Sequence, residues 1–528
     1  MIITKGDGTM KLRIVLILLF LIAWYLIAII KLFQIQVLNN KYKQIANQQF
    51  ILRIQRFPKR GTVYDRNLRP IAYSIPRLQV YQYLKDAVDY YGILNAFKHE
   101  SVENNNNYPK LISRDVPVEY KKFILSPKEK GFFAIKYYKR VYPFYEISQN
   151  VIGFVIDTLG MEGLEKALDN YLKGYSGYEE IFQSADGKRF FLPKESKNEP
   201  KNGLDIITTL DMRIQEIAYR NLKNGVISES ANWGFVIVLN PKTGEILAMA
   251  NYPNSYKNYA IQLMFEPGST FKIFTFAKAI ELNLISDSDS VFVNKEGIMI
   301  DNHRIKNVEK TQGYITYKKA LSYSINSVFA EIGVKLGGIQ LFEIARRVGF
   351  GIRTDVLLNG ETNGILKRRF RNIDVANFAI GQGFSINGLQ MAMAYSCIAN
   401  GGYLLAPKIV LKVGDSLYNK PYVIRKCFSK KITEKLKELL IDVVENGSGK
   451  LAKIESLKIA GKTGTSQKFI NGSYSDDKVI TSFIGFFPAD DPNYLIYVVL
   501  DEPKKNKFGG TSAAPIFRNI VLEIIQKI

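Results

Sequence analysis

Histidine, cysteine and tryptophan are scarce in this chain: its 528 residues include two of each. Cys/His metal clusters need three or four such ligands at short spacings, so His99, His303, Cys397 and Cys427 cannot form one. Neither histidine lies near a G-x-S-x-G turn, where an α/β-hydrolase triad places its nucleophile. A serine enzyme of this composition therefore needs a base other than histidine. The two cysteines do not decide the redox compartment, and we expect free, buried thiols.

Acidic residues are also few. Asp and Glu number 49 against 72 Lys and Arg, which leaves a net charge of +23. Such an excess suits either nucleic acid or an anionic membrane surface. The lysines are dispersed, and no RRM, KH or zinc-finger pattern accompanies them. We therefore predict a membrane partner and no nucleic acid.

Long apolar runs are missing except for one. Residues Ile14–Ile30 carry no charge and are just long enough to span a bilayer. Basic residues precede this run and predict a cytoplasmic N-terminus: Lys5, Lys11 and Arg13. No A-x-A cleavage site follows the run. The sequence predicts a cytoplasmic tail at 1–13, an uncleaved single-pass anchor at 14–33, and the remainder outside the cytoplasmic membrane.

The composition and periodicity of the chain after the anchor change near residue 200. Residues ~85 to ~200 show few periodic runs and end in a segment of linker composition, Pro193–Gly203. We therefore predict one domain at 34–205 and another at 206–528. In the second domain, strand-like runs stand on both sides of a long block with helical periodicity. This order indicates an α+β fold, with helices packed on an antiparallel sheet.

The stretch FEPGSTFKIF, Phe265–Phe274, places a serine after a Pro-Gly turn and a lysine three residues later. A helix beginning here brings Ser269 and Lys272 onto one face. A hydroxyl with an amine one turn away can be a nucleophile with its base. The alternative is a capping serine and a solvated lysine, and this motif alone does not decide between them.

Two further short motifs follow. Ser324 and Asn326 share one face only if they lie at a bend or a helix end, and a Ser/Asn cap is the simpler interpretation. The strand-like run LKIAGKTGTSQKF contains Lys462-Thr463-Gly464-Thr465. As an edge strand it would accept an extended peptide, with Lys462 and the threonine hydroxyls holding a carboxylate. An ordinary hairpin turn is the alternative.

The ordered set S-x-x-K, S-x-N and K-T-G-T behind a membrane anchor resembles the class B penicillin-binding proteins, which are peptidoglycan D,D-transpeptidases. The resemblance covers nearly the whole chain. RGTVYDRN at 60–67 and GMEGLEKALDNYLKG at 160–174 resemble motifs of the family's N-terminal pedestal domain. FEPGST, IAYSIP and KFGGTSAAPIF fit the septal cell-division branch best, and the elongation branch is the alternative.

The resemblance implies an elongated mixed pedestal (dimerisation-type) domain and a serine β-lactamase-like transpeptidase domain, in which helices cover both sides of a five-stranded antiparallel sheet. It assigns acylation to Ser269, the base to Lys272, proton relay to Ser324, and the positioning of Lys272 and substrate to Asn326. The resemblance assigns substrate binding and stabilisation of the oxyanion to the K-T-G-T residues Lys462, Thr463, Gly464 and Thr465.

The resemblance also implies partners. These are peptidoglycan stem peptides as D-Ala-D-Ala donor and amine acceptor, β-lactams as inhibitors, a SEDS-family glycosyltransferase and other division proteins, with no metal or organic cofactor. It implies structural roles in the pedestal for Arg60, Gly61, Asp65, Arg66 and Glu165. A hydrolytic relative and a non-catalytic receptor are the competing hypotheses; the large pedestal and the intact lysines weigh against them.

Overall fold

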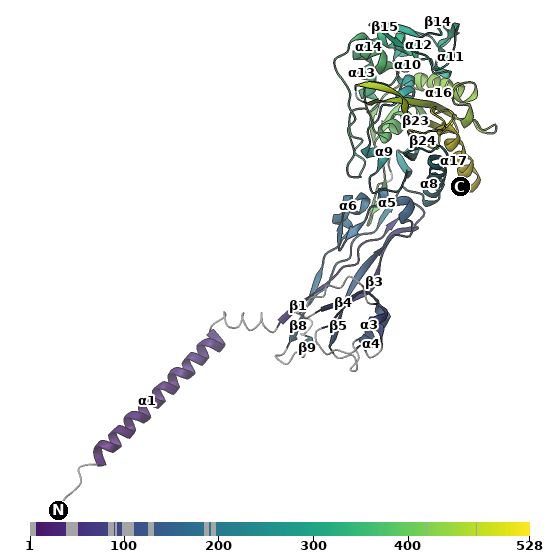
Figure 1. Cartoon of the computed structure of the whole chain (residues 1–528). Coiled ribbons are helices and arrows are strands. Elements are labelled where there is room, and N and C mark those ends of the chain that lie inside the picture. Colours follow the sequence, from purple (N-terminus) through teal and green to yellow (C-terminus); the bar gives the residue numbers. More distant parts are fainter. Residues whose placement is uncertain are drawn as a thin grey trace, which may run out of the picture. The chain divides into compact units, whose positions relative to one another are not determined.

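The structure is a computed structural model that describes residues 7–38, 51–82, 89, 92–97, 110–124, 131–183, 189–191, 197–418, 420–470 and 472–528 (Figure 1). Residues 1–6 of the predicted tail, 39–50 after the anchor and 193–196 of the predicted linker lie outside the described residues. The chain forms two compact units. Unit 1 is Met1–Pro58, Pro76–Tyr138 and Tyr175–Lys201, and unit 2 is Lys59–Ile75, Lys139–Gly174 and Asn202–Ile528. The boundary at 205/206 stays a prediction, because packing groups 59–75 and 139–174 with the C-terminal part.

Helix α1 (Asp7–Phe33) contains the predicted anchor. Its apolar side chains are exposed along the whole run, which is the state expected of a helix that lipid will surround. A 30-residue segment, Gly8–Val37, is long and apolar enough to cross a membrane, and an 18-residue window within it has a mean hydropathy of 2.8. Among the described residues, one helix could therefore cross a membrane, and it lies where the sequence predicts the anchor.

Unit 1 is built from short antiparallel pairings. Strand β1 (Ile51–Arg56) pairs with β8 (Gly177–Gln183), which also pairs with β9 (Arg189–Phe191) and β10 (Lys197–Asn198). The later part of β3 (Pro70–Gln82) pairs with β4 (Lys110–Pro117), and β5 (Phe132–Val141) pairs with β3. A small core of Leu78, Val80, Leu94, Val116, Ile124 and Phe132 stabilises it.

The first segments of unit 2 contain β2 (Val63–Tyr64), the start of β3, and helices α5 (Tyr145–Ile152), α6 (Gly163–Ala167) and α7 (Asp169–Leu172). β2 pairs in parallel with β11 (Ile206–Thr208), which pairs with β19 (Val410–Val413). β20 (Ser416–Leu417) completes this side of the sheet. These pairings tie the Arg60–Asn67 motif to the C-terminal part of the chain.

The main sheet of unit 2 has five antiparallel strands in the order β13-β12-β24-β23-β22. The strands are β12 (Trp233–Asn240), β13 (Glu245–Tyr252), β22 (Ala460–Ile470), β23 (Ser473–Phe487) and β24 (Tyr494–Asp501). The five-stranded sheet predicted from the resemblance is confirmed. β22, which carries the K-T-G-T residues, is an edge strand, as its proposed peptide-accepting role requires.

Helices cover both faces of this sheet (Figure 1). Along β12, Phe235, Ile237 and Leu239 join one core while Val236 and Val238 join another, because successive side chains of a strand point to opposite faces. Helices α8 (Met212–Ser228) and α17 (Ala513–Lys527) supply the second core. The first core contains α10 (Lys272–Glu281), α12 (Asn326–Leu336), α15 (Gly388–Ala399) and α16 (Lys430–Glu445). The α+β class is confirmed.

The remaining elements of unit 2 surround this frame. They include α9 (Tyr259–Gln262), α11 (Tyr317–Ser322), α13 (Gly338–Arg347) and α14 (Asn372–Ala379). Four two-stranded pairs are β6 (Val155–Ile156) with β7 (Leu159–Gly160), β14 (Ser290–Val293) with β17 (Gly313–Thr316), β15 (Ile298–Ile300) with β16 (His303–Ile305), and β18 (Tyr403–Leu405) with β21 (Val423–Lys426).

Candidate active site

Ser269 lies in a 3₁₀ turn, Gly268–Phe271, that runs directly into α10. A 3₁₀ turn has three residues, so Ser269 and Lys272 project from the same side. Gly268 has a φ of +57°, and a Cβ there would lie 2.6 Å from the carbonyl oxygen of Thr465. Only glycine lets this turn approach strand β22 so closely. Ser269 itself stays half-exposed at this junction.

The Lys272 side chain is fully buried among apolar groups of α10 and α12. Its Nζ donates hydrogen bonds to Ser324 O (2.7 Å), Ser324 Oγ (3.1 Å) and Asn326 Oδ1 (2.6 Å). It also lies 5.6 Å from the centre of the Phe329 ring. The first and second motifs are therefore joined through one amine, although 52 residues separate Lys272 from Ser324.

Ser324 and Asn326 lie where α11 ends and α12 begins, which is the bend that their common orientation requires. Ser324 has a φ of +59°, an uncommon conformation for a residue other than glycine. Such strained positions are concentrated at functional sites. This bend turns the Ser324 hydroxyl and the Asn326 amide toward the same lysine.

Lys462 reaches the same hydroxyl from the edge strand. Its Nζ donates to Ser324 Oγ (3.0 Å) and to Thr463 O (3.1 Å), and its side chain is fully buried. Along the strand, Thr463 Oγ1 lies 2.8 Å from Ser448 Oγ. Thr465 Oγ1 accepts a hydrogen bond from Gly509 N at 3.1 Å, which leaves its own proton free for a ligand.

Gly464 allows the edge strand and the Ser269 turn to pack together. A Cβ at Gly464 would clash with Ser482 Oγ and lie 2.9 Å from Thr270 Cγ2. The structure thus brings the eight predicted site residues together on the Ser269 turn, the Ser324 bend and strand β22.

Burial changes the protonation of both amines. Burial, and then the charge of Lys462, hold the pKa of Lys272 well below its usual value. Burial lowers the pKa of Lys462 to about 7. Two like charges in one dry site oppose each other, so burial and this repulsion both favour an unprotonated amine beside the hydroxyls. This is the protonation state that a general base requires.

The motif analysis missed one acidic residue, Glu266. Its Oε1 accepts hydrogen bonds from Gly383 N (3.0 Å) and from Tyr474 Oη (3.2 Å). Burial raises its carboxyl pKa to about 7. Glu266 therefore connects the segment before Ser269 to the loop after α14 and to β23. Glu266 could have been found from the sequence as a charged residue between Phe265 and Pro267, in a stretch whose other residues indicate burial.

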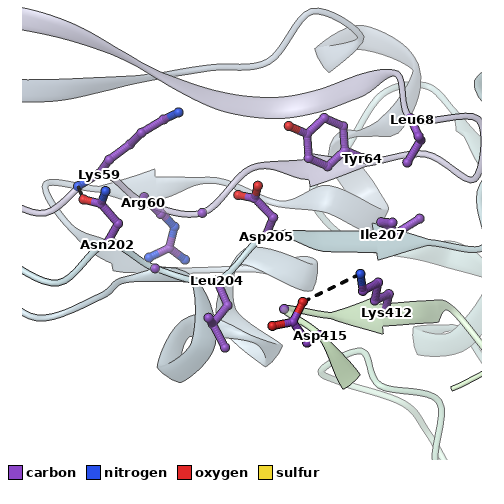
Figure 2. Close-up of a pocket in the computed structure, with 13 residues that line it drawn as sticks. Lys59, Arg60, Tyr64, Leu68, Asn202, Leu204, Asp205, Ile207, Lys412 and Asp415 are labelled. Carbon is purple, nitrogen blue, oxygen red and sulfur yellow. Dashed lines mark hydrogen bonds and ion pairs between the residues drawn. The ribbon is translucent and has the colours of Figure 1, made fainter. Parts of the chain in front are cut away.

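A separate cavity of about 500 Å³ lies in unit 2 along β2 and β11 (Figure 2). Lys59, Tyr64 and Asp205 line it, and an ion pair of 4.0 Å joins Lys412 to Asp415 at one side. None of the eight predicted site residues is among the described residues that line this cavity. Its volume alone does not make it the reaction site.

The domain assignments agree with this geometry. The model of the penicillin binding protein transpeptidase domain matches residues 234–522, and that of the penicillin-binding protein dimerisation domain matches residues 55–208. Stage V sporulation protein D of Bacillus subtilis (strain 168) is 32% identical over 99% of this chain and 87% of its own length. Peptidoglycan D,D-transpeptidase FtsI of Buchnera aphidicola subsp. Baizongia pistaciae is 28% identical over 98% of this chain and 96% of its own length.

A solved structure agrees as well. Penicillin binding protein 3 from Mycobacterium tuberculosis, complexed with aztreonam, has a TM-score of 0.71 at 25% identity and covers 90% of this chain and 97% of its own. This chain belongs to the penicillin-binding protein transpeptidase family, and its two matched domains are those of a class B penicillin-binding protein.

Proposed function

We propose that this protein is a peptidoglycan D,D-transpeptidase that cross-links stem peptides through an acyl-enzyme on Ser269. One observation carries the proposal: Lys272 and Lys462, both buried, lie within hydrogen-bond distance of the Ser324 hydroxyl beside the Ser269 turn. Family membership and the FtsI relative support the same activity.

In the acylation step, Ser269 Oγ attacks the carbonyl carbon of the penultimate D-Ala of a donor peptide, and Lys272 Nζ takes the hydroxyl proton. The lowered pKa of Lys272 keeps its lone pair available for that proton. Asn326 holds the amine in place through the 2.6 Å bond to Oδ1. Ser324, bonded to both lysines, passes a proton to the departing amine of the terminal D-Ala.

The edge strand orients the donor. The terminal carboxylate is bound by Lys462, by Thr463 and by the free hydroxyl proton of Thr465, since a cation and hydroxyl donors suit a carboxylate. The backbone N–H groups of Ser269 and Thr465 stabilise the oxyanion, and one such donor is worth about 3–4 kcal/mol of barrier. An amine from a second stem peptide then attacks the ester carbonyl, releases Ser269 and completes the cross-link.

For the cellular role, we propose septal wall synthesis, supported by the FtsI relative and by the FEPGST and KFGGTSAAPIF segments. The basic residues before α1 support a cytoplasmic N-terminus with the transpeptidase domain outside the membrane. A SEDS-family glycosyltransferase and other division proteins are the proposed partners.

A fluorescent penicillin tests the activity on the full chain in detergent. We expect stable covalent label on the wild type, none on Ser269→Ala, and full label on Ser288→Ala, an exposed serine outside the site. Thermal unfolding confirms that each variant is folded. Label on Ser269→Ala, or no label on a folded wild type, would refute the acyl-enzyme. Rapid loss of label would favour a hydrolase.

A further inference from the structure

A second cavity of about 220 Å³ lies at the far end of strand β22 from Lys462. Phe469 of β22 and Tyr474 of β23 form one wall, with ring centroids 5.2 Å apart, and Phe370, Phe378 and Phe384 contribute further aromatic surface. Lys367 and several polar residues line the rest. The volume suits one or two amino-acid side chains rather than a large cofactor.

This cavity is coupled to the Ser269 turn. Tyr474 and Gly383, which line it, both donate to Glu266 Oε1, and Glu266 lies three residues before Ser269. The loop that contains Gly383 also contacts the turn directly, because Gly268 N donates to Gly381 O at 2.9 Å. The loop that contains Gly381 and Gly383 therefore contacts both the segment before Ser269 and the cavity wall.

The edge strand gives the direction of a bound donor. In the proposed function the terminal carboxylate lies at Lys462 and Thr463, and the scissile carbonyl lies at Thr465. A donor extended along β22 then continues from Thr465 toward Phe469, four residues or about 13 Å along the strand. Residues that precede D-Ala-D-Ala in the donor thus arrive at the cavity.

The charges at the cavity indicate which kind of donor-peptide residue would bind there. Arg371 is paired with Asp374 at 3.1 Å, which neutralises both. Lys367 is exposed and forms no ion pair within 4.0 Å among the described residues, although its charge also acts on the carboxyls of Glu266 and Asp374. An exposed ammonium beside an aromatic wall suits a residue with a carboxylate on an otherwise apolar peptide.

We propose that this cavity is a subsite for the donor stem peptide upstream of D-Ala-D-Ala, in which Lys367 binds a free carboxylate of the peptide and Phe469 and Tyr474 pack on its chain. This proposal rests on the proposed transpeptidase function. Glu266 is a positioning residue for the wall, because it holds Tyr474 and Gly383 without lining the cavity.

Two synthetic donor peptides test the subsite on the full chain in detergent. Both end in D-Ala-D-Ala and differ only at the γ-linked D-glutamyl residue, which carries either a free α-carboxylate or the corresponding amide. Each peptide competes with fluorescent penicillin for labelling. We expect the acid to compete about 3- to 5-fold better than the amide in the wild type, as one exposed ion pair allows. This preference should vanish in Lys367→Ala and in Lys367→Gln.

Arg369→Ala is the matched control, because Arg369 is an exposed cation of the same basic run and does not line the cavity. It should keep the wild-type preference. Equal competition by the two peptides in the wild type, no competition by either one, or a preference that survives in both Lys367 variants would overturn the subsite. Failure of the wild type to bind penicillin would instead count against the proposed function, so the two failures are distinguishable.

Discussion

Lys272 Nζ and Lys462 Nζ lie 3.1 Å and 3.0 Å from one oxygen atom, Ser324 Oγ, although they come from a helix and an edge strand. Both side chains are fully buried, and no carboxylate forms an ion pair with either amine among the described residues. A buried pair of like charges is unfavourable, so the site favours a state with at least one neutral amine.

The first prediction concerns the pH dependence of acylation. Since burial lowers the pKa of Lys462 to about 7 and that of Lys272 also falls well below normal, the base is already available at neutral pH. The rate of penicillin labelling should rise from acidic pH as Lys272 loses its proton, and fall above about pH 7 as Lys462 loses the charge that binds the carboxylate. Stopped-time labelling between pH 5 and 10 measures this profile. A rate that keeps rising toward pH 10 would indicate a lysine with an ordinary pKa.

Asn326→Asp should move that profile. The substitution places a carboxylate 2.6 Å from Lys272 Nζ, and an opposite charge at that distance favours the ammonium form. We expect the midpoint to rise by about 1–3 pH units, with labelling at pH 7 reduced about tenfold or more. Asn326→Ala separates charge from lost anchoring: it should slow labelling without raising the midpoint. Equal midpoints in the Asp and Ala variants would contradict the role of Lys272 as base.

Sequence reasoning could name the residues of the candidate site because they are concentrated in three short motifs. Ser269 and Lys272 are one turn apart, and alternation along a strand fixes how Lys462 and Gly464 are placed. The bend at Ser324 could not be predicted, because no sequence signal marks a residue other than glycine that adopts a positive φ. The structure resolves it through contacts with Lys272, which is 52 residues away.

The contacts of Glu266 and the cavity at Phe469 could not be predicted from local patterns. Glu266 meets Gly383 and Tyr474 only after folding, across 117 and 208 residues. The membrane anchor and the strands of the main sheet were predictable, since length and periodicity determine them. Which segments pack together, including residues 59–75 with the C-terminal part, depends on tertiary contacts that periodicity does not encode.

A buried ion network provides a stability prediction outside the active site. Glu165, which is fully buried, accepts from Arg60 Nε at 2.6 Å and from Arg140 Nε at 2.7 Å. Glu165→Gln removes the carboxylate that the buried Arg140 contacts, while Arg60 keeps its ion pair with Asp169 at 2.7 Å. Breaking this buried pair should cost about 3–5 kcal/mol. The drop in the thermal unfolding midpoint measures it.

The exposed Glu216 provides the control for that network, since its ion pair with Arg220 spans 3.8 Å at the surface. Glu216→Gln should change stability by less than about 1 kcal/mol. Molecules of Glu165→Gln that remain folded should still bind penicillin at Ser269. A loss of labelling with unchanged stability would show that Glu165 acts in the reaction rather than in the fold.

The buried carboxyl of Glu266 predicts that the free energy of unfolding falls as pH rises. Burial raises its carboxyl pKa from 4.5 to about 7, so between these values the unfolded chain releases a proton that the folded protein keeps. The wild type therefore loses stability as pH rises through this window, by at most about 3 kcal/mol. Glu266→Gln removes the titration and retains an oxygen that can accept from Gly383 and Tyr474. Its stability relative to wild type should increase from pH 4.5 to 7 and stay constant above. Thermal unfolding across that range, with the exposed Glu296→Gln as control, measures the difference. A difference that does not change with pH would mean that the carboxyl of Glu266 has the same pKa in the folded and unfolded chain.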